Sequence, residues 1–436
     1  QWKDCHSQNK LSLENPSNGE IITTITDSDE QDIDEAINSA SKSLRSSWGN
    51  LAASERGRLL LKLSELVKNR LDNLAIIESI DVGKPLKQAK NDAIALARYF
   101  EFYGGASDKI MGETIPYLKD YTVYTLREPH GVTGHIIPWN YPMQIIGRTL
   151  GASLAMGNAC VLKPSEEACL TALAIGELAT EAGFPEGSIN IVPGLGNKVG
   201  SSLISHPDID HISFTRSVEI GKTIQSEAAK NLVPVTLELG GKSPQIVFPD
   251  CDLELAVNGV AGGIFPAGGQ SCISGSRLLI HKSIIKDFTE CLVATVKKAR
   301  VGNPADPDTQ IGPMANQLHY ENVLKKISDA EQEGHNLVLD GRSACRDEGY
   351  YIGPTIFSDV STRSDLAQNE VFGPVVSTES WDEEEQVIKM ANDTIYGLAA
   401  GIWSNNVTKA MKVADEIEAG TVYINNYFNA AAQSPV

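Results

Sequence analysis

The pattern of hydrophobic and polar positions changes character along the chain. The first part is mainly helical, because apolar residues recur at helical spacing over 29–46 and 54–74, and a third helix is predicted over 84–103. Two short strands are predicted on either side of the turn-forming residues 15–19. Residues 121–127 alternate like an exposed strand, for which we predict an oligomer contact.

From His130 onward, short apolar strands alternate with helices. The predicted strands are 132–137, 159–162, 189–192, 211–214 and 233–239, and the predicted helices are 143–156, 168–182, 199–205 and 218–229. Strand–helix pairs in this rhythm predict right-handed βαβ units and a parallel sheet of the nucleotide-binding type. No GxGxxG motif follows any of these strands, so the ordinary Rossmann fingerprint is absent.

A second alternating region follows and predicts a second α/β domain. Its predicted strands are 278–281, 375–380 and 421–425, and its predicted helices are 284–299, 316–333, 384–392 and 408–418. The predicted fold class is therefore α/β, with two Rossmann-like parallel-sheet domains.

Composition and charge narrow the possible partners. A chain of 436 residues is too long for one ordinary core, which favours two or three domains. The 37 Lys and Arg residues against 56 Asp and Glu residues give a net charge of −19, a field that repels nucleic acid and anionic membranes. No apolar run reaches the roughly 18 residues needed to cross a bilayer.

The cysteines indicate a reducing compartment. There are seven, an odd number, with wide spacings and no CxxC pair, so neither a disulfide framework nor a metal site is predicted. No signal peptide is visible, and a cytoplasmic location is favoured. The chain begins with Gln1 and ends with Val436; both ends look trimmed, which leaves targeting segments open.

The segment 235–277 contains the strongest candidate chemistry. Glu238 lies near the end of an apolar predicted strand, just before the pair Gly240-Gly241. Cys272 follows later in the segment, among glycines and serines. Small neighbours let substrate and backbone amides approach the sulfur, and a nearby carboxylate can deprotonate a thiol or a water. The alternative is structural: a free cysteine is among the most buried residue types, and Glu238 would then simply end an edge strand.

Two further clusters lie where predicted strands end. Pro138-Trp139-Asn140-Tyr141-Pro142 fixes a turn in which the Asn140 amide is held rigidly, as a developing oxyanion requires; the alternative is that Asn140 caps the next helix. Lys163 and Glu166 in Lys163-Pro164-Ser165-Glu166 can hold the hydroxyls of a ribose, or form a surface salt bridge at a helix entry.

The last two clusters are the segments 214–221 and 370–374. Ser217 and the free amides of the helix that follows it can bind a pyrophosphate. Glu370 and Phe372 can supply a ribose contact and a ring wall, or belong to a plain turn.

Taken together, these motifs resemble the aldehyde dehydrogenase superfamily, NAD(P)-dependent enzymes that oxidise aldehydes to carboxylic acids. The resemblance covers essentially the whole chain and rests on the intact motifs PWNYP, KPSE, LELGGKSP, GQSC and EVFGP. It implies an NAD-binding domain over 1–109 and 130–240, an oligomerisation arm over 110–129 and a catalytic domain over 241–436. Relatives carry a C-terminal tail, which here would follow Val436.

The resemblance implies a role for each matching residue. Cys272 corresponds to the nucleophile that forms a thiohemiacetal and then a thioester, Asn140 to the oxyanion hole, and Glu238 to the base that activates the hydrolytic water. The cofactor-binding positions are Ile137, Pro138, Trp139, Lys163, Ser165, Glu166, Gly196, Phe214, Ser217, Leu239, Gly240, Glu370 and Phe372.

Glu166 and Arg216 bear on the cofactor. A carboxylate accepts a hydrogen bond from a ribose 2′-hydroxyl but repels a 2′-phosphate, so NAD is favoured over NADP. The positive charge of Lys163 weakens this preference. Most relatives have glycine where Arg216 stands. Its side chain can reach the cofactor phosphates, crowd the helix start and weaken cofactor binding, or point to solvent.

The substrate is predicted to be a small-molecule aldehyde, and Arg148 suggests one that carries a distal carboxylate. Arg148 resembles the arginine by which succinate semialdehyde enzymes hold a distal carboxylate, with a local ion pair or a subunit contact as alternatives. The predicted substrate-contacting residues are Tyr141, Gln144, Arg148, Ser271, Ile273 and Phe428. Aromatic residues in this set suggest that the pocket also accepts apolar or aromatic aldehydes.

Two alternatives to a hydrolytic, NAD-dependent enzyme stay open. A CoA-acylating enzyme is one, and Glu238 argues against it because CoA would replace the activated water. A catalytically retired binding or structural protein is the other, favoured only by Arg216. Relatives pair as dimers or dimers of dimers, so a homodimer or homotetramer is expected.

Overall fold

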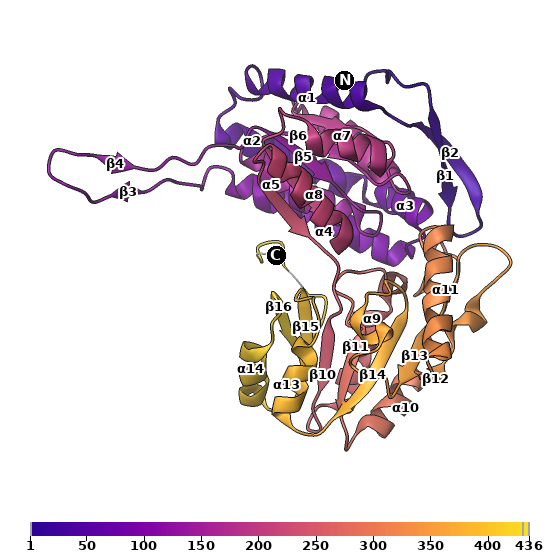
Figure 1. Ribbon diagram of the computed structural model, residues 1–436. Helices are drawn as coiled ribbons and strands as arrows, with labels where there is room; N and C mark the ends of the chain where they lie inside the picture. Colours follow the sequence, from indigo (N-terminus) through magenta and orange to yellow (C-terminus); the bar gives the residue numbers. More distant parts are fainter. Residues whose placement is uncertain (1, 430, 435–436) are drawn as a thin grey trace. The chain divides into compact units, whose positions relative to one another are not determined.

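The computed structural model describes residues 2–429 and 431–434 (Figure 1). The chain forms two compact units, each with its own parallel sheet. The first unit contains residues 2–13, Ile21–Asp81 and Ala89–Glu238, and the second contains Glu14–Glu20, Val82–Gln88 and the chain from Leu239 onward.

The sheet of the first unit has five strands, all parallel, in the order β7-β6-β5-β8-β9. The strands are β5 (Val132–Ile136), β6 (Ala159–Lys163), β7 (Ile189–Ile191), β8 (His211–Thr215) and β9 (Val235–Glu238). These match the predicted strands to within about two residues at each end, and the parallel-sheet fold class is confirmed. All their carboxyl ends lie at one edge, where ligands bind in open α/β sheets.

The helices associated with this unit are α1 (Glu30–Leu44), α2 (Ala53–Asn69), α3 (Leu71–Val82), α4 (Leu86–Ala106), α5 (Pro142–Ala155), α6 (Leu170–Ala182), α7 (Ser201–Ser205) and α8 (Val218–Lys230). Helix α1 begins with a capping box at Asp29 and packs its buried face on β5, β6 and β7. The single helix predicted over 54–74 is wrong. It is two helices, because α2 ends at Asn69 and is capped by Arg70, whose N–H donates to the carbonyls of Leu66 and Val67.

Two antiparallel pairs stand apart from the large sheets. Strands β1 (Lys10–Asn15) and β2 (Glu20–Thr26) flank the predicted turn. Strands β3 (Thr114–Ile115) and β4 (Val123–Tyr124) form a long hairpin that extends away from the helices of the first unit (Figure 1). Both strands of the hairpin are only two residues long, so the strand predicted over 121–127 is much shorter than expected.

The sheet of the second unit has seven strands in the order β12-β13-β14-β11-β10-β15-β16, and only β12 runs antiparallel to its neighbour. The strands are β10 (Pro244–Val247), β11 (Arg277–His281), β12 (Asn336–Leu339), β13 (Thr355–Ser358), β14 (Val375–Trp381), β15 (Ala399–Trp403) and β16 (Thr421–Ile424). The pattern did not predict β10, β12, β13 or β15. Every residue of β10 and β15 is buried, so neither shows the alternation that marks a half-exposed strand.

Helices cover both faces of this second sheet. They are α9 (Leu253–Ile264), α10 (Ile285–Val296), α11 (Gln317–Gln332), α12 (Asp365–Gln368), α13 (Glu384–Asn392) and α14 (Val407–Glu416). Leu278 and Ile280 of β11 pack with residues of α9 and α10, while Leu279 between them packs with residues of α13 and α14. The alternation along β11 therefore divides the core into two layers.

Within residues 2–429 and 431–434, no helix combines the length and the apolar character needed to span a bilayer.

Candidate active site

Three loops of the second unit converge because of strand register. Strands β10, β11 and β14 are parallel neighbours, with Pro244 beside Arg277 and Arg277 beside Ser377. The segments that precede these strands therefore meet at the amino edge of the sheet. They carry the Gly240-Gly241 pair, Cys272, and Glu370 with Phe372.

The glycine pair lies between the Glu370 carboxylate and the Cys272 main chain. A β-carbon on Gly240 would lie 2.3 Å from Glu370 Oε2, and one on Gly241 would lie 2.6 Å from the Cys272 carbonyl oxygen. Any larger residue would have to displace one of these groups. The Gly241 N–H also donates to Glu370 Oε1 at 3.1 Å. The two glycines thus hold together residues that lie far apart in the sequence.

Cys272 is partly exposed in a tightly bonded loop. Its neighbour Ser271 is buried, and the Ser271 carbonyl accepts a hydrogen bond from Ser274 N–H at 3.0 Å. The Tyr427 hydroxyl donates to the carbonyl of Ile273 at 2.9 Å. Phe428 packs edge-on against Tyr427, with 5.4 Å between ring centroids. The predicted substrate residues Ser271, Ile273 and Phe428 therefore lie in or beside the cysteine loop.

Three of the other cysteines, Cys160, Cys169 and Cys251, have thiols whose pKa is raised by burial. Burial raises the pKa of Cys160 to about 11, and burial together with Asp250 raises the pKa of Cys251 to about 11. Burial also raises the pKa of Cys169. Because the thiolate is the nucleophile, these three thiols are poor nucleophiles near neutral pH.

Two lysine ammonium groups lie close enough to Glu370 to affect its pKa. Burial raises the pKa of Glu370 to about 7, although the Gly241 N–H and the ammonium groups of Lys242 and Lys326 act in the opposite direction. Burial also lowers the pKa of Lys242, which is 1% exposed. A carboxyl group that titrates near neutrality beside a buried lysine is typical of functional sites.

In the first unit, Lys163 and Glu166 form an ion pair at the carboxyl edge of the sheet. Lys163 Nζ lies 2.7 Å from Glu166 Oε2, and Gly196 N–H donates to Glu166 Oε1 at 3.4 Å. Burial alone would raise the pKa of Glu166, but Lys163 and, to a smaller extent, Arg216 leave it below its usual value. Lys163 is buried and the pair is not a surface salt bridge.

Ser217 and Arg216 lie where β8 passes into α8. Ser217 is the N-cap of α8, and its hydroxyl accepts from Ile220 N–H at 3.4 Å. The Arg216 N–H donates to the carbonyl of Glu238 at 3.1 Å, which ties the end of β8 to the end of β9. The Arg216 side chain is exposed and lies near Glu166.

Asn140 lies in the turn between β5 and α5 and is 7% exposed. The N-cap of α5 is Tyr141, one residue further on, so Asn140 does not occupy the capping position. Further along α5, Gln144 donates to Asp92 Oδ1 at 2.6 Å. Arg148 is partly exposed near Tyr103, and its guanidinium makes no hydrogen bond or ion pair with the residues that the structure describes.

The remaining predicted cofactor residues lie in three places: near the Lys163–Glu166 pair, within β8, and directly before the glycine pair. Ile137 N–H donates to the carbonyl of Lys163 at 3.2 Å, Pro138 and Trp139 follow in the buried turn, and the Ser165 hydroxyl bonds to Glu167. Phe214 is buried within β8, and Leu239 directly precedes the glycine pair.

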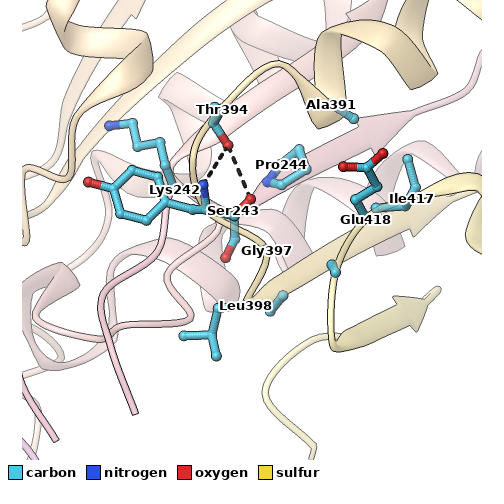
Figure 2. A pocket seen from close by; sticks show the side chains of 12 residues that line it. Lys242, Ser243, Pro244, Ala391, Thr394, Gly397, Leu398, Ile417 and Glu418 are labelled. Carbon is cyan, nitrogen blue, oxygen red and sulfur yellow. Dashed lines mark hydrogen bonds between the residues drawn. The ribbon is translucent and has the colours of Figure 1, made fainter. Parts of the chain in front are cut away.

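Beside the glycine pair lies a small pocket with room for about one water molecule. Lys242, Ser243 and Pro244 form one wall, and the segments 391–399 and 417–419 form the rest (Figure 2). The lining does not include Cys272, Glu370 or Phe428, so we do not assign this pocket to an aldehyde.

Sequence reasoning missed Lys242, Lys326 and His319. Lys242 lies within the LELGGKSP motif, which was the available signal. His319 and Lys326 are seven residues apart on α11, a spacing that places them on one helix face but does not point to a partner. In the described part of the chain, no group of three or more His, Cys, Asp or Glu residues is placed to hold a metal ion.

The comparisons with known proteins identify the family. A profile of the aldehyde dehydrogenase family matches residues 2–436. An aldehyde dehydrogenase of Emericella nidulans is 42% identical over 97% of this chain and 85% of its own, and human retinal dehydrogenase 2 is 42% identical over 100% and 85%. The crystal structure of Staphylococcus aureus betaine aldehyde dehydrogenase in complex with NAD+ superposes with a TM-score of 0.98, at 36% identity over 100% of this chain and 87% of that chain.

The parallel sheets and the helices around them define an α/β protein. The chain belongs to the aldehyde dehydrogenase family and is an oxidoreductase.

Proposed function

We propose that this enzyme oxidises an aldehyde to a carboxylic acid with NAD as cofactor, through a covalent intermediate on Cys272. The observation that carries this proposal is the Gly240-Gly241 turn, which holds the Glu370 carboxylate on one side and the Cys272 main chain on the other. The site thus combines a nucleophile with a cofactor-type carboxylate in one rigid loop arrangement.

The chemistry assigned to Cys272 has two parts. Its sulfur attacks the aldehyde carbon as the thiolate, so that a C–S bond forms and the carbonyl electron pair moves to oxygen. Asn140 and the Cys272 main-chain N–H stabilise that oxygen by donating hydrogen bonds. Loss of hydride then leaves a thioester on Cys272, and bound NAD supplies the hydride acceptor.

Glu238 completes the reaction as a general base. It takes a proton from a water molecule, whose oxygen attacks the thioester carbon; the C–S bond breaks, the acid leaves, and the electron pair of that bond returns to sulfur as the Cys272 thiolate. Glu238 is the last residue of β9, and its main chain is held by Arg216. This bond fixes the backbone while leaving the carboxylate available for the base role.

The residues of both units fit the cofactor. In the first unit, the Lys163–Glu166 pair is suited to the adenosine ribose, and the N-terminus of α8 at Ser217 is suited to a pyrophosphate. In the second unit, the Glu370 carboxylate is suited to the nicotinamide ribose, and the absence of a side chain on Gly240 leaves room for this carboxylate. NAD is preferred over NADP, because Glu166 keeps its negative charge, but the positive charges of Lys163 and Arg216 weaken this preference.

The assay that tests this function measures NADH formation with a panel of aldehydes, together with the acid produced. We expect one NADH per acid molecule, and a lower kcat/KM with NADP than with NAD. Titration of the protein with NAD, followed through the fluorescence of its five tryptophans, tests cofactor binding directly. If no NAD binds at millimolar concentration, the chain is a retired homologue and the proposal fails.

Arg148 is the basis for proposing a substrate with a distal carboxylate. Its guanidinium has no carboxylate partner among the described residues, so it is available to bind one. We expect Arg148→Ala to lower kcat/KM for succinate semialdehyde by about 10- to 100-fold, the scale of a charge-assisted hydrogen bond, while butanal changes little. An unchanged ratio between the two substrates would exclude this role for Arg148.

The β3–β4 hairpin supports a proposal of self-association. Its side chains include Met111, Tyr117 and Leu126, which are 75%, 66% and 69% exposed. A hairpin that exposes large apolar side chains is suited to packing against a second copy of the chain. A homodimer or a homotetramer therefore remains our expectation.

A further inference from the structure

Helix α11 presents a stripe of three residues to the segment that carries Glu370 and Phe372. His319, Val323 and Lys326 are spaced by four and three residues and therefore share one face of the helix. Each of the three meets a different residue of 370–373. All of these residues belong to the second unit.

The contacts are made mainly to the backbone of the segment. Lys326 Nζ donates to the carbonyl of Glu370, and His319 Nε2 lies 2.8 Å from the carbonyl oxygen of Phe372. Because a carbonyl can only accept, Nε2 of His319 must carry the proton. Val323 lies between His319 and Lys326 on the helix. A β-carbon on Gly373 would lie 2.8 Å from the Val323 side chain, so the segment lies directly on the helix.

The segment needs such support because its backbone is strained. Phe372 has a φ of 59°, in the left-handed region that a bulky side chain rarely adopts. Conformations of this kind persist only where the surrounding structure fixes them. The His319 ring also packs edge-on against the Phe372 ring, with 5.8 Å between centroids, so both the backbone and the side chain of Phe372 are held.

We propose that His319 and Lys326 are positioning residues that place Glu370 and Phe372 for the nicotinamide half of the cofactor. They act by holding the main-chain carbonyls of Phe372 and Glu370, while the Gly241 N–H holds the Glu370 carboxylate. This inference rests on the proposed function, since it presupposes that Glu370 binds the cofactor.

The test compares the dissociation constants of NAD and ADP for four variants, measured by protein fluorescence. ADP lacks the nicotinamide half and serves as the probe for the rest of the site. His319→Leu and Lys326→Met each remove one carbonyl contact, and we expect each to weaken NAD about 5- to 10-fold and ADP less than about 2-fold. His319→Gln keeps an N–H donor and restores NAD binding to within about 2-fold.

Lys325→Met is the matched control on the same helix. Lys325 is exposed and pairs with Asp329 one turn further on, away from the 370–373 segment. It should leave both dissociation constants unchanged. Its thermal unfolding, compared with that of Lys326→Met, shows whether any loss of NAD binding comes only from a less stable fold.

A double-mutant cycle separates positioning from general support of the fold. In a Glu370→Ala background, Lys326→Met should cause little further loss of NAD affinity, because the carboxylate that Lys326 positions is gone. Equal weakening of NAD and ADP, or no effect of either substitution on NAD, overturns the inference while leaving the proposed function intact. Failure of the unaltered protein to bind NAD overturns both.

Discussion

Cys272→Ala is expected to abolish NADH formation with every aldehyde, by at least about 10³-fold, because the residue that makes the covalent intermediate is gone. Removal of a catalytic nucleophile has effects of this size or larger, since residual catalysis comes only from binding and oxyanion stabilisation. The measurement is the initial rate of NADH formation at saturating aldehyde. NAD affinity and thermal unfolding should stay close to those of the unaltered protein, because a small, partly exposed side chain is being shortened.

Cys291→Ala is the matched control for this experiment. Cys291 is an exposed free thiol on α10 and is not part of the cysteine loop, so its loss should leave the rate unchanged. NADH production at the full rate in Cys272→Ala would contradict the assigned nucleophile. A loss of rate accompanied by a loss of NAD binding would instead indicate that the loop had rearranged.

The alternating part of the fold could be predicted from the sequence because its strands are separated by amphipathic helices. The strands β5, β6 and β8 were predicted within about one residue, since each is a short apolar run followed by a turn. β15 was not predicted. Its five buried residues, Ala399–Trp403, give no period-two pattern, and nothing within the segment shows that it pairs between β10 and β16.

The candidate site residues also differ in whether the sequence carries a signal for them. Glu238 and Cys272 could be named as candidates because they stand in motifs that the family shares, and Lys163 and Glu166 because they lie where a strand ends. His319 and Lys326 were not found, because their partners are main-chain carbonyls about 50 residues away, and a carbonyl group leaves no mark on the sequence. Gln144 was predicted to contact substrate; its side chain donates a hydrogen bond to Asp92 in the structure, and its contact with substrate stays a prediction.

Glu238→Gln is expected to slow hydrolysis of the acyl-enzyme by about 10²- to 10⁴-fold while leaving hydride transfer much less affected. Glutamine keeps the shape of the side chain and keeps the backbone carbonyl that accepts from Arg216, but it cannot accept a proton from water. Rapid mixing with aldehyde and NAD should give a burst of one NADH per site, followed by a slow steady rate. Mass spectrometry of the protein should detect the acyl group on Cys272.

The same variant decides between hydrolysis and transfer to CoA. If Glu238 serves only to activate water, a thiol can attack the thioester without it, because the sulfur is itself a good nucleophile. Added CoA or another thiol should then raise the steady rate of Glu238→Gln towards the rate of the burst. The unaltered enzyme should turn over without any thiol, since water is its acceptor. A strict requirement of the unaltered enzyme for CoA would instead make it an acyl-transferring dehydrogenase, and an unimpaired steady rate in Glu238→Gln would show that another group is the base.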